Sequence, residues 1–436
     1  MKRHTPLLLF VLLIALQTAL AQTTFHGDVA RTGVYESRGP QQLNNVKWTF
    51  KADGAIISSP SIANGTIFVG SVDTNLYAVD QETGAQKWKF KTDGPITSSA
   101  AVADGTVYFA STDGVFYALA ADTGAVKWRF STERGERRFE ARGIHGSRPR
   151  GQNAADPFDI FTSSPAVFEN RVYFGSGDGN IYALDAQTGV LRWRFMTGDV
   201  VHASPAVANN TVYVGSWDSY LYALDAETGA ERWRFKAGED PVDHNQQGFQ
   251  SSPAVVDGVL YVGCRDAHVY AIDAATGRKK WDYYTSKSWV NGTPAVGGGG
   301  VYVGTGDTRK FLALDAKTGR LRYSLDSKTG LFSSPALAGG LAYVGNLNGR
   351  LLAVDVREGK IAWEFQTEGS KDDPLKILNP DGTRNPARNR PTFFDFQDMY
   401  LYWYRNYSVG AIVSSPVVDR GELYFGSTDG FLYALR

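Results

Sequence analysis

A few aromatic and polar side chains depart from an otherwise repetitive sequence, and they are the residues that could do chemistry. Trp217 and Trp289 lie outside the position at which most tryptophans recur, and the flat face of an indole can stack on a planar ligand or pack against neighbouring loops. The polar residues that break the pattern near the same end of the repeat are His202, Asp243, His244, Gln250, Arg265 and Asn291. We expect these side chains to reach the rim of one central opening.

None of the familiar catalytic motifs accompanies these residues. The sequence has no Gly-rich phosphate loop, Gly-x-Ser-x-Gly elbow, His-Glu-x-x-His pair or calcium-binding EF-hand loop. His202 and His244 have no further ligands at a metal-binding spacing, so we predict no metal site. Cys264 is the single cysteine, which excludes an intrachain disulfide, and we expect it to be a small buried side chain. The sequence therefore offers no firm catalytic residue.

The overall charge is balanced. Lys and Arg together number 45, and Asp and Glu together number 45. A chain without net charge creates no field that would gather nucleic acid or an acidic membrane surface. We predict no nucleic-acid partner, and a monomeric protein.

The first residues have the order of a secretory signal. Met1, Lys2 and Arg3 precede an apolar run over 7–16, and small residues lead to Ala21, after which we expect cleavage. The run is too short for a confident transmembrane span. A cysteine that could carry a lipid anchor is not found near this site. We therefore expect an exported, soluble protein in the periplasm or outside the cell.

A repeat of about forty residues organises the rest of the chain. Eight segments share one pattern, and they begin at Ser59, Ser99, Ser164, Ser204, Ser252, Thr293, Ser334 and Ser415. In the first unit, Asn64-Gly65 and Glu82-Thr83-Gly84 are turns between short apolar runs, and Trp88 is the centre of a fourth strand. This spacing predicts four strands per unit, and a repeated unit of this kind stacks on its neighbours. A recurring Asp, first seen as Asp73, is expected to form a turn rather than a catalytic group.

The two ends of the repeat predict a closed ring. The last unit has three strands, and residues 45–50, with Trp48, have the pattern of a missing fourth strand. Joining them gives an all-β, eight-bladed propeller of four-stranded antiparallel blades, because closure removes exposed sheet edges. We expect one domain over 45–436, preceded by a lead segment over 22–44.

Three insertions interrupt the repeat, at 131–162, 236–250 and 366–413. All of them connect one blade to the next, so we expect them on one face of the propeller. The first alternates arginines with acidic residues, which favours a solvated or partly ordered loop, with an anionic-ligand site as the alternative. The third contains many aromatic residues, among them Phe393, Phe394, Phe396, Tyr400, Tyr402, Trp403 and Tyr404. It is expected either to cover the channel or to bind a partner.

The recurring string resembles a known family. Residues 215–233, Gly-Ser-Trp-Asp-Ser-Tyr-Leu-Tyr-Ala-Leu-Asp-Ala-Glu-Thr-Gly-Ala-Glu-Arg-Trp, look like the pyrroloquinoline-quinone (PQQ) repeat of quinoprotein dehydrogenases and of BamB-type outer-membrane assembly factors. Residues 25–33 also resemble the start of such propellers. The resemblance implies the fold, and it implies two classes of function, because fold alone does not specify activity.

One class is a PQQ- and calcium-dependent alcohol or sugar dehydrogenase. In that case Trp217 or Trp289 would stack on the quinone, Arg265 would lie near its carbonyl oxygens and Asp243 would be the base. Gln250, Asn291 and His202 would be further cofactor contacts. The chain cannot form the ring of adjacent cysteines found in many such enzymes, and it has no haem-attachment motif.

The other class is a BamB-like scaffold without a cofactor, which binds an envelope protein or a small ligand at the face that carries the insertions. We expect this non-catalytic role, with the dehydrogenase as the alternative and a purely structural surface protein as a third class. The missing lipid-anchor cysteine departs from the lipoprotein form of the BamB family.

Overall fold

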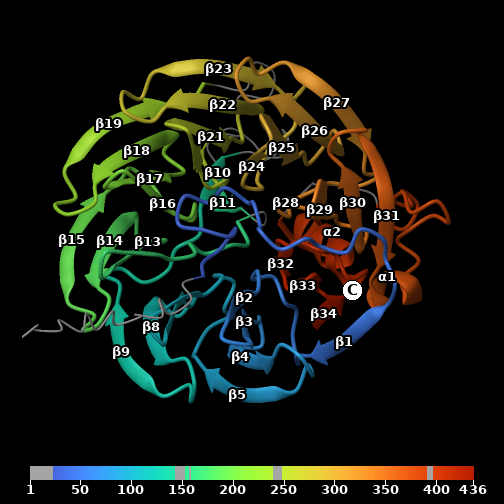
Figure 1. Ribbon diagram of the computed structural model, residues 1–436, viewed down its shortest axis with the longest axis horizontal. Helices are drawn as coiled ribbons and strands as arrows, with labels where there is room; N and C mark the ends of the chain where they lie inside the picture. Colours follow the sequence, from blue (N-terminus) through green and yellow to red (C-terminus); the bar gives the residue numbers. More distant parts are fainter. Residues whose placement is uncertain (1–22, 143–152, 157–158, 239–247, 390–395) are drawn as a thin grey trace, which may run out of the picture.

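Eight four-stranded antiparallel sheets surround a central axis, as Figure 1 shows. The computed structural model describes residues 23–142, 153–156, 159–238, 248–389 and 396–436. The predicted all-β, eight-bladed propeller is therefore confirmed.

In each blade the strands follow one another from the innermost to the outermost. Blade 1 contains β2 (Ser61–Ala63), β3 (Thr66–Gly70), β4 (Asn75–Asp80) and β5 (Gln86–Lys91). Blade 2 contains β6 (Ala101–Ala103), β7 (Thr106–Ala110), β8 (Val115–Ala120) and β9 (Val126–Ser131). Blade 3 contains β12 (Ala166–Phe168), β13 (Arg171–Gly175), β14 (Asn180–Asp185) and β15 (Leu191–Met196). Blade 4 contains β16 (Ala206–Ala208), β17 (Thr211–Gly215), β18 (Tyr220–Asp225) and β19 (Glu231–Lys236).

Blades 5 to 8 have the same order. Blade 5 contains β20 (Ala254–Val256), β21 (Val259–Gly263), β22 (His268–Asp273) and β23 (Lys279–Tyr284). Blade 6 contains β24 (Ala295–Gly297), β25 (Gly300–Gly304), β26 (Lys310–Asp315) and β27 (Leu321–Asp326). Blade 7 contains β28 (Ala336–Ala338), β29 (Leu341–Gly345), β30 (Arg350–Asp355) and β31 (Lys360–Gln366). Blade 8 contains β32 (Val417–Asp419), β33 (Glu422–Gly426), β34 (Phe431–Leu435) and β1 (Val46–Lys51).

Blade 8 closes the ring as the repeat predicts. Strand β1 pairs antiparallel with β34, and Trp48 lies opposite Ala434. Strands from the two ends of the chain thus share one sheet, and the ring has no free edge at this point. The second strands are almost wholly buried, whereas the fourth strands alternate between exposed and half-buried residues. This difference arises because neighbouring blades cover both faces of the inner strands.

In seven blades the repeated aromatic residue of the fourth strand bonds to the next blade, and in blade 7 Trp363 donates to the carbonyl of Pro40 in the lead segment. Trp193 in blade 3 donates its indole N–H to the carbonyl of Ala226 in blade 4 at 3.0 Å. Its ring lies over Gly229, where a Cβ would come within 2.6 Å of the indole. Gly229 has φ of +73°, so both the close approach and the turn require glycine. The recurring Asp73 accepts from the backbone N–H of Asn75 at 2.9 Å, which confirms its predicted role in a turn.

The lead segment lies across the hairpin end of the channel, where Figure 1 shows it crossing the centre of the ring. Its backbone bonds to the innermost strands of several blades; Val207, for example, donates to the carbonyl of Val29 at 2.7 Å. Arg31 is fully buried there, and it donates to the carbonyls of Pro205, Phe25, Ser164 and Pro165 at 2.6, 2.7, 2.9 and 3.2 Å. Burial lowers the pKa of Arg31 to about 9.

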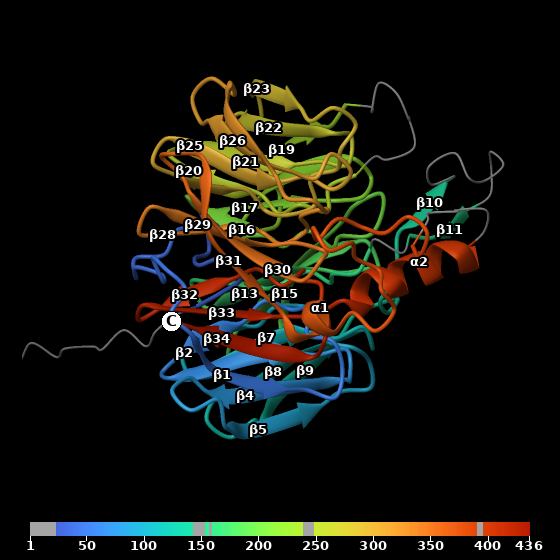
Figure 2. The ribbon, with the colours of Figure 1, turned by 90° about the vertical axis from the view of Figure 1, so that its right-hand side faces the viewer.

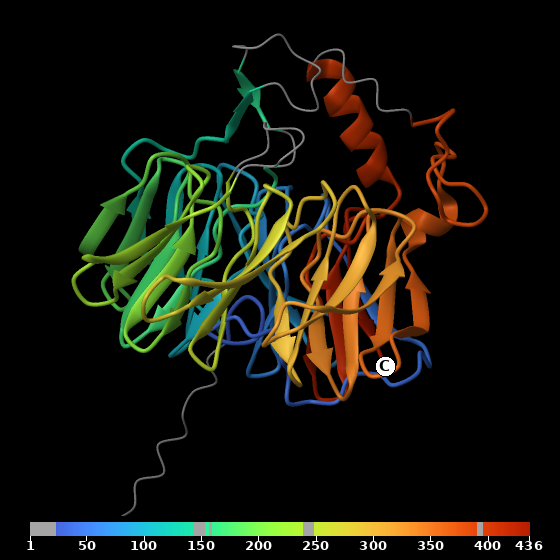
Figure 3. The same cartoon turned by 90° about the horizontal axis from the view of Figure 1, so that it is seen from above.

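The insertions carry the structure's remaining elements. The first contains β10 (Glu140–Arg142) and β11 (Asn153–Ala155), and the third contains α1 (Glu368–Asp372) and α2 (Phe396–Ser408). The β10–β11 pair and α2 rise from the same side of the disc, as the sequence predicts (Figures 2 and 3). Most of the second insertion lies outside the described residues. Within the described part of the chain, no helix has the length and apolar character needed to cross a membrane.

Candidate binding face and central channel

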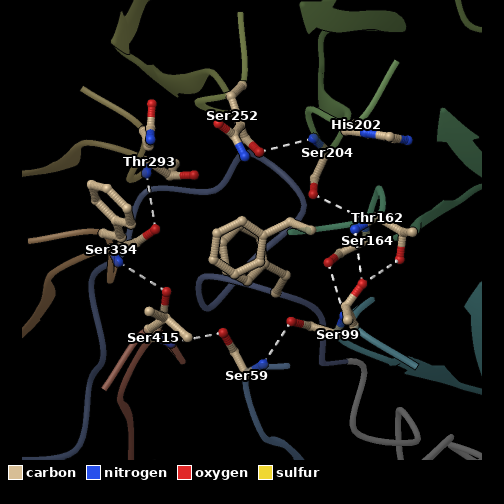
Figure 4. A pocket seen from close by; sticks show the side chains of 17 residues that line it. Ser59, Ser99, Thr162, Ser164, His202, Ser204, Ser252, Thr293, Ser334 and Ser415 are labelled. Carbon is tan, nitrogen blue, oxygen red and sulfur yellow. Dashed lines mark hydrogen bonds between the residues drawn. The ribbon is translucent and has the colours of Figure 1, made fainter. Parts of the chain in front are cut away.

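Hydrogen bonds between neighbouring blades line the channel. At seven of the eight junctions, the first residue of one blade donates its backbone N–H to the side-chain oxygen of the equivalent residue in the next blade. Ser59 N–H, for example, donates to Ser99 Oγ at 2.8 Å, and Ser415 N–H donates to Ser59 Oγ at 2.9 Å. Figure 4 shows this ring of residues. The repeated Ser thus has a structural role, because it satisfies a backbone donor that would otherwise be buried without a partner.

Three predicted site residues share one position of the repeat. His202, Gln250 and Asn291 each stand two residues before the first residue of blades 4, 5 and 6, and all three line the channel cavity. Each is buried. The structure therefore brings these residues together along one side of the channel mouth.

A second group of predicted residues forms a stack above them. Trp217 and Arg265 occupy the same position of the repeat in blades 4 and 5. The guanidinium of Arg265 lies 4.4 Å from the centre of the Trp217 ring and 3.7 Å from that of Trp289. These distances are typical of cation–π contacts. All three side chains are at most 2% exposed.

The first insertion completes this stack. Phe139 lies parallel to Trp217, with 4.0 Å between the ring centres and 25° between the planes. Asp156 forms an ion pair of 2.7 Å with Arg265, and both side chains are buried. The two ends of the insertion are held to each other, because Asp156 donates its backbone N–H to the carbonyl of Phe139 at 2.8 Å. The insertion therefore supplies both the counter-charge of Arg265 and a ring that covers Trp217.

His202 makes a second ionic contact with the same insertion. Its Nδ1 lies 2.5 Å from Asp159 Oδ1 and its Nε2 lies 2.6 Å from Glu136 Oε1. Burial alone would lower the pKa of His202, but the charges and hydrogen bonds of Asp159 and Glu136 raise it to about 10. At neutral pH this side chain is an imidazolium between two carboxylates.

These contacts agree with a partly ordered rather than a fully solvated first insertion. Its described parts are fixed over the channel mouth, with Asp156 and Asp159 buried and Ile160 packed beside Trp289. The insertion is held there by ion pairs. Its acidic residues neutralise His202 and Arg265, two cationic side chains that the propeller buries. The alternative of an anionic-ligand site at the insertion's arginines stays a prediction, because part of that set lies outside the described residues.

The space left for a cofactor is small. The cavity that the Ser ring and the mouth residues enclose has a volume of about 40 Å³, enough for a few water molecules. Sites for drug-sized ligands measure roughly 300–1,000 Å³. Phe139 and Arg265 already lie on faces of the two tryptophans. In this arrangement the predicted cofactor residues do not form a site that fits PQQ. No group of three or more His, Cys, Asp or Glu that could hold a metal ion occurs among the residues the structure describes.

The third insertion exposes part of its helix. Leu401 is 38% and Tyr404 is 59% exposed. The base of α2 is anchored: Tyr402 accepts a hydrogen bond from Arg384, and Asn406 accepts from Asn389 at 2.5 Å. Tyr402 and Tyr407 pack against the apolar group around Trp289 and Phe332. The same part of α2 thus has anchored side chains at Tyr402 and Asn406 and exposed ones at Leu401 and Tyr404.

Several predicted residues remain untested. Asp243, His244, Phe393 and Phe394 lie outside the described residues. Phe396, Tyr400 and Trp403 belong to α2, but their side chains are not described. Cys264 is fully buried, as expected, and burial raises the pKa of its thiol.

Sequence reasoning missed Phe139 and Arg31 as contributors to this region, and it placed Glu136, Asp156 and Asp159 in solvent. One signal was present: His202 and Arg265 stand at repeat positions that are apolar or small in many other blades. Buried cations need buried anions, and the first insertion contains several acidic residues.

The fold and this closed channel define a class of protein, the eight-bladed PQQ-like propeller. The family model of the outer membrane protein assembly factor BamB matches residues 41–158, 137–291 and 265–381. The chain belongs to this family. Among curated protein sequences there is no match.

Solved structures of both functional classes share the fold. BamB from Moraxella catarrhalis is 18% identical, with a TM-score of 0.63 over 90% of this chain and 97% of that one. A europium-containing methanol dehydrogenase is 16% identical, with a TM-score of 0.66 over 92% and 89%. The quinohemoprotein alcohol dehydrogenase from Comamonas testosteroni is also 16% identical, with a TM-score of 0.66 over 94% and 80%. At these identities the likeness concerns the fold alone.

Proposed function

We propose that this protein is an exported, non-catalytic scaffold with a BamB-like role in outer-membrane protein assembly. It binds a protein partner of the cell envelope through the face that carries the insertions. The observation that carries the proposal is the closed channel mouth: Arg265, Trp217 and Trp289 contact the chain's own Phe139 and Asp156.

The exposed residues of α2 support a protein partner. Helix α2 rises above the disc (Figure 3), and its Leu401 and Tyr404 are exposed. Aromatic side chains are enriched at the centres of interfaces. The anchored base at Tyr402 and Asn406 supports the same reading, because a fixed element loses less conformational entropy on binding.

Affinity capture with matched variants tests the proposal. The mature protein is used to capture partners from detergent-solubilised envelopes of its own organism, and the captured proteins are identified by mass spectrometry. The test variant carries Leu401→Asp and Tyr404→Ser. The control carries Leu321→Asp and Tyr284→Ser, at outer-strand positions that are 44% and 37% exposed.

The proposal expects the wild type and the control to capture the same outer-membrane assembly protein, and the α2 variant to lose it. Equal capture by the α2 variant and the control would contradict the assigned surface. Failure of the wild type to capture any assembly protein would contradict the role.

A further inference from the structure

A pocket of about 630 Å³ lies on the opposite face of the propeller, between blades 6 and 7. Its volume falls in the range of small-molecule sites, roughly 300–1,000 Å³. It is lined by Tyr302, Arg322 and Tyr323 of blade 6, by Leu337 and Arg357 of blade 7 and by Tyr35 of the lead segment, together with several glycines and aliphatic residues. The pocket takes no part in the proposed binding of a protein at the insertion face.

The pocket exists because blade 6 departs from the repeat at its fourth strand. In most blades the fourth-strand aromatic is Trp, as in Trp193, whose indole N–H reaches the next blade. Blade 6 has Tyr323 instead, and its hydroxyl donates to the carbonyl of Val356 at 3.1 Å. The hydrogen bond to the next blade is kept, and the ring lies over Gly359 as Trp193 lies over Gly229, but a phenol ring fills less space than an indole.

A second departure moves a tyrosine. In blades 3 and 4, Tyr173 and Tyr213 donate to the carbonyl of the following blade at 3.0 Å. In blade 6 the corresponding carbonyl, that of Val356, accepts a hydrogen bond from Tyr323. Tyr302, the equivalent of Tyr173 and Tyr213, lies over Gly300 instead. A Cβ at Gly300 would be 2.5 Å from Tyr302 Oη. The glycine therefore permits the displaced ring, which becomes a wall of the pocket.

The hairpin turns beside the pocket also lack side chains. The first turn residue is Asn64 in blade 1 and Asp257 in blade 5, but it is Gly298 in blade 6 and Gly339 in blade 7. A Cβ added at Gly298 would meet no other atom within 4 Å. The opening between these two blades is thus bordered by two turns without side chains at this position.

The charge of the lining is positive. Arg322 and Arg357 are its ionisable cations, and no acidic side chain is among the described residues that line it. Arg322 is oriented by two bonds from Nη2, to Asp315 Oδ2 at 2.8 Å and to the carbonyl of Gly299 at 2.5 Å. A guanidinium has five N–H donors in a planar fork, so the remaining ones suit a carboxylate.

We propose that this pocket binds a small aromatic carboxylate. The ring of the ligand packs between Tyr302, Tyr323 and Leu337, and its carboxylate contacts Arg322 and Arg357. The apolar walls contribute burial of the ring, and the arginines select the anionic form.

Isothermal titration calorimetry with indole-3-acetate and with neutral indole-3-acetamide tests the proposal. The expected Kd of the acid is about 0.1–1 mM, in keeping with a ligand of this size. The amide should bind at least about tenfold more weakly, because it cannot form the charge-assisted bonds.

Variants locate the binding. Tyr323→Trp restores the repeated residue and should abolish binding of the acid. Arg357→Gln, at an exposed position, should weaken it about tenfold without changing the melting temperature. The control is Arg232→Gln, because Arg232 pairs with Asp225 in blade 4 just as Arg322 pairs with Asp315. This control should bind the acid like the wild type.

Absence of saturable binding by the wild type at concentrations well above this range would overturn the proposal. So would equal affinity for the acid and the amide. Undiminished binding in Arg357→Gln or in a folded Tyr323→Trp variant would also overturn it, since the ligand would then lie elsewhere.

Discussion

The guanidinium of Arg265 lies 3.7 Å from the centre of the Trp289 ring. The contact joins two residues that the sequence singled out as cofactor contacts, Trp289 for stacking and Arg265 for the carbonyl oxygens, and here they contact each other. Because Asp156 neutralises Arg265 from the first insertion, the insertion and the propeller form one buried unit at the channel mouth. We predict that this unit can be loosened without unfolding the blades.

Removing the counter-charge of Arg265 should release the first insertion. Asp156→Asn leaves a buried cation without its anion, and such losses cost about 3–5 kcal/mol. Hydrogen–deuterium exchange should rise over 131–142 and 153–156 while the blades stay protected. The control is Glu227→Gln, whose pair with Arg171 is 3.4 Å long with a glutamate 69% exposed; its effect should stay within about 1 kcal/mol. Equal exchange in the two variants would contradict the buried pair.

The docked insertion should weaken as the pH rises. His202 keeps its proton up to pH about 10 in the folded protein, whereas its ordinary pKa is 6.5. Between these values the folded state binds one more proton than the unfolded state, so the free energy of unfolding falls as the pH increases. This contribution is complete below pH 6.5 and is lost through pH 10.

His202→Gln isolates the effect. The difference in unfolding free energy between wild type and variant, measured by urea denaturation, should shrink from pH 6.5 to pH 10. His268, whose pKa the hydrogen bond to Asp266 raises despite burial, is present in both proteins and cancels. A difference that does not vary with pH would show that His202 is not charged in the folded protein.

Arg31 should stabilise the hairpin end of the channel. It donates to the carbonyls of four residues from three parts of the chain, and hydrogen bonds to charged groups contribute about 1.5–3 kcal/mol each before the cost of burial. Arg31→Ala should lower the free energy of unfolding by at least about 2 kcal/mol, measured with urea. Arg38→Ala, at an exposed position of the same segment, is the control, and identical midpoints for the two variants would be inconsistent with this role.

The blades and their closure were predictable because they depend on local, repeated chemistry. The pair Asn64-Gly65 favours a tight turn, and a tryptophan such as Trp88 follows at a fixed distance in most units. The strand with Trp48 supplies what the last unit lacks. Each signal lies within one unit of about forty residues, so periodicity alone reveals it.

The contacts at the channel mouth were not predictable in the same way. Asp156 is far from Arg265 in sequence and lies in an insertion outside the repeat, and the alternating charges of that insertion are typical of solvated loops. Only the folded arrangement shows that the carboxylates face buried cations. The pocket between blades 6 and 7 is an intermediate case: Tyr323 and Gly300 break the repeat visibly, but the movement of Tyr302 follows from packing.

A titration of the mature protein with PQQ and Ca²⁺, followed by tryptophan fluorescence, decides whether the channel mouth is closed to a cofactor. The chain itself fills the stack of Trp217, Arg265 and Trp289, in a channel with about 40 Å³ of free space. We therefore expect no saturable quenching and no dye reduction with alcohols or sugars. Tight, calcium-dependent binding with turnover would contradict this expectation and would make the protein a quinoprotein dehydrogenase.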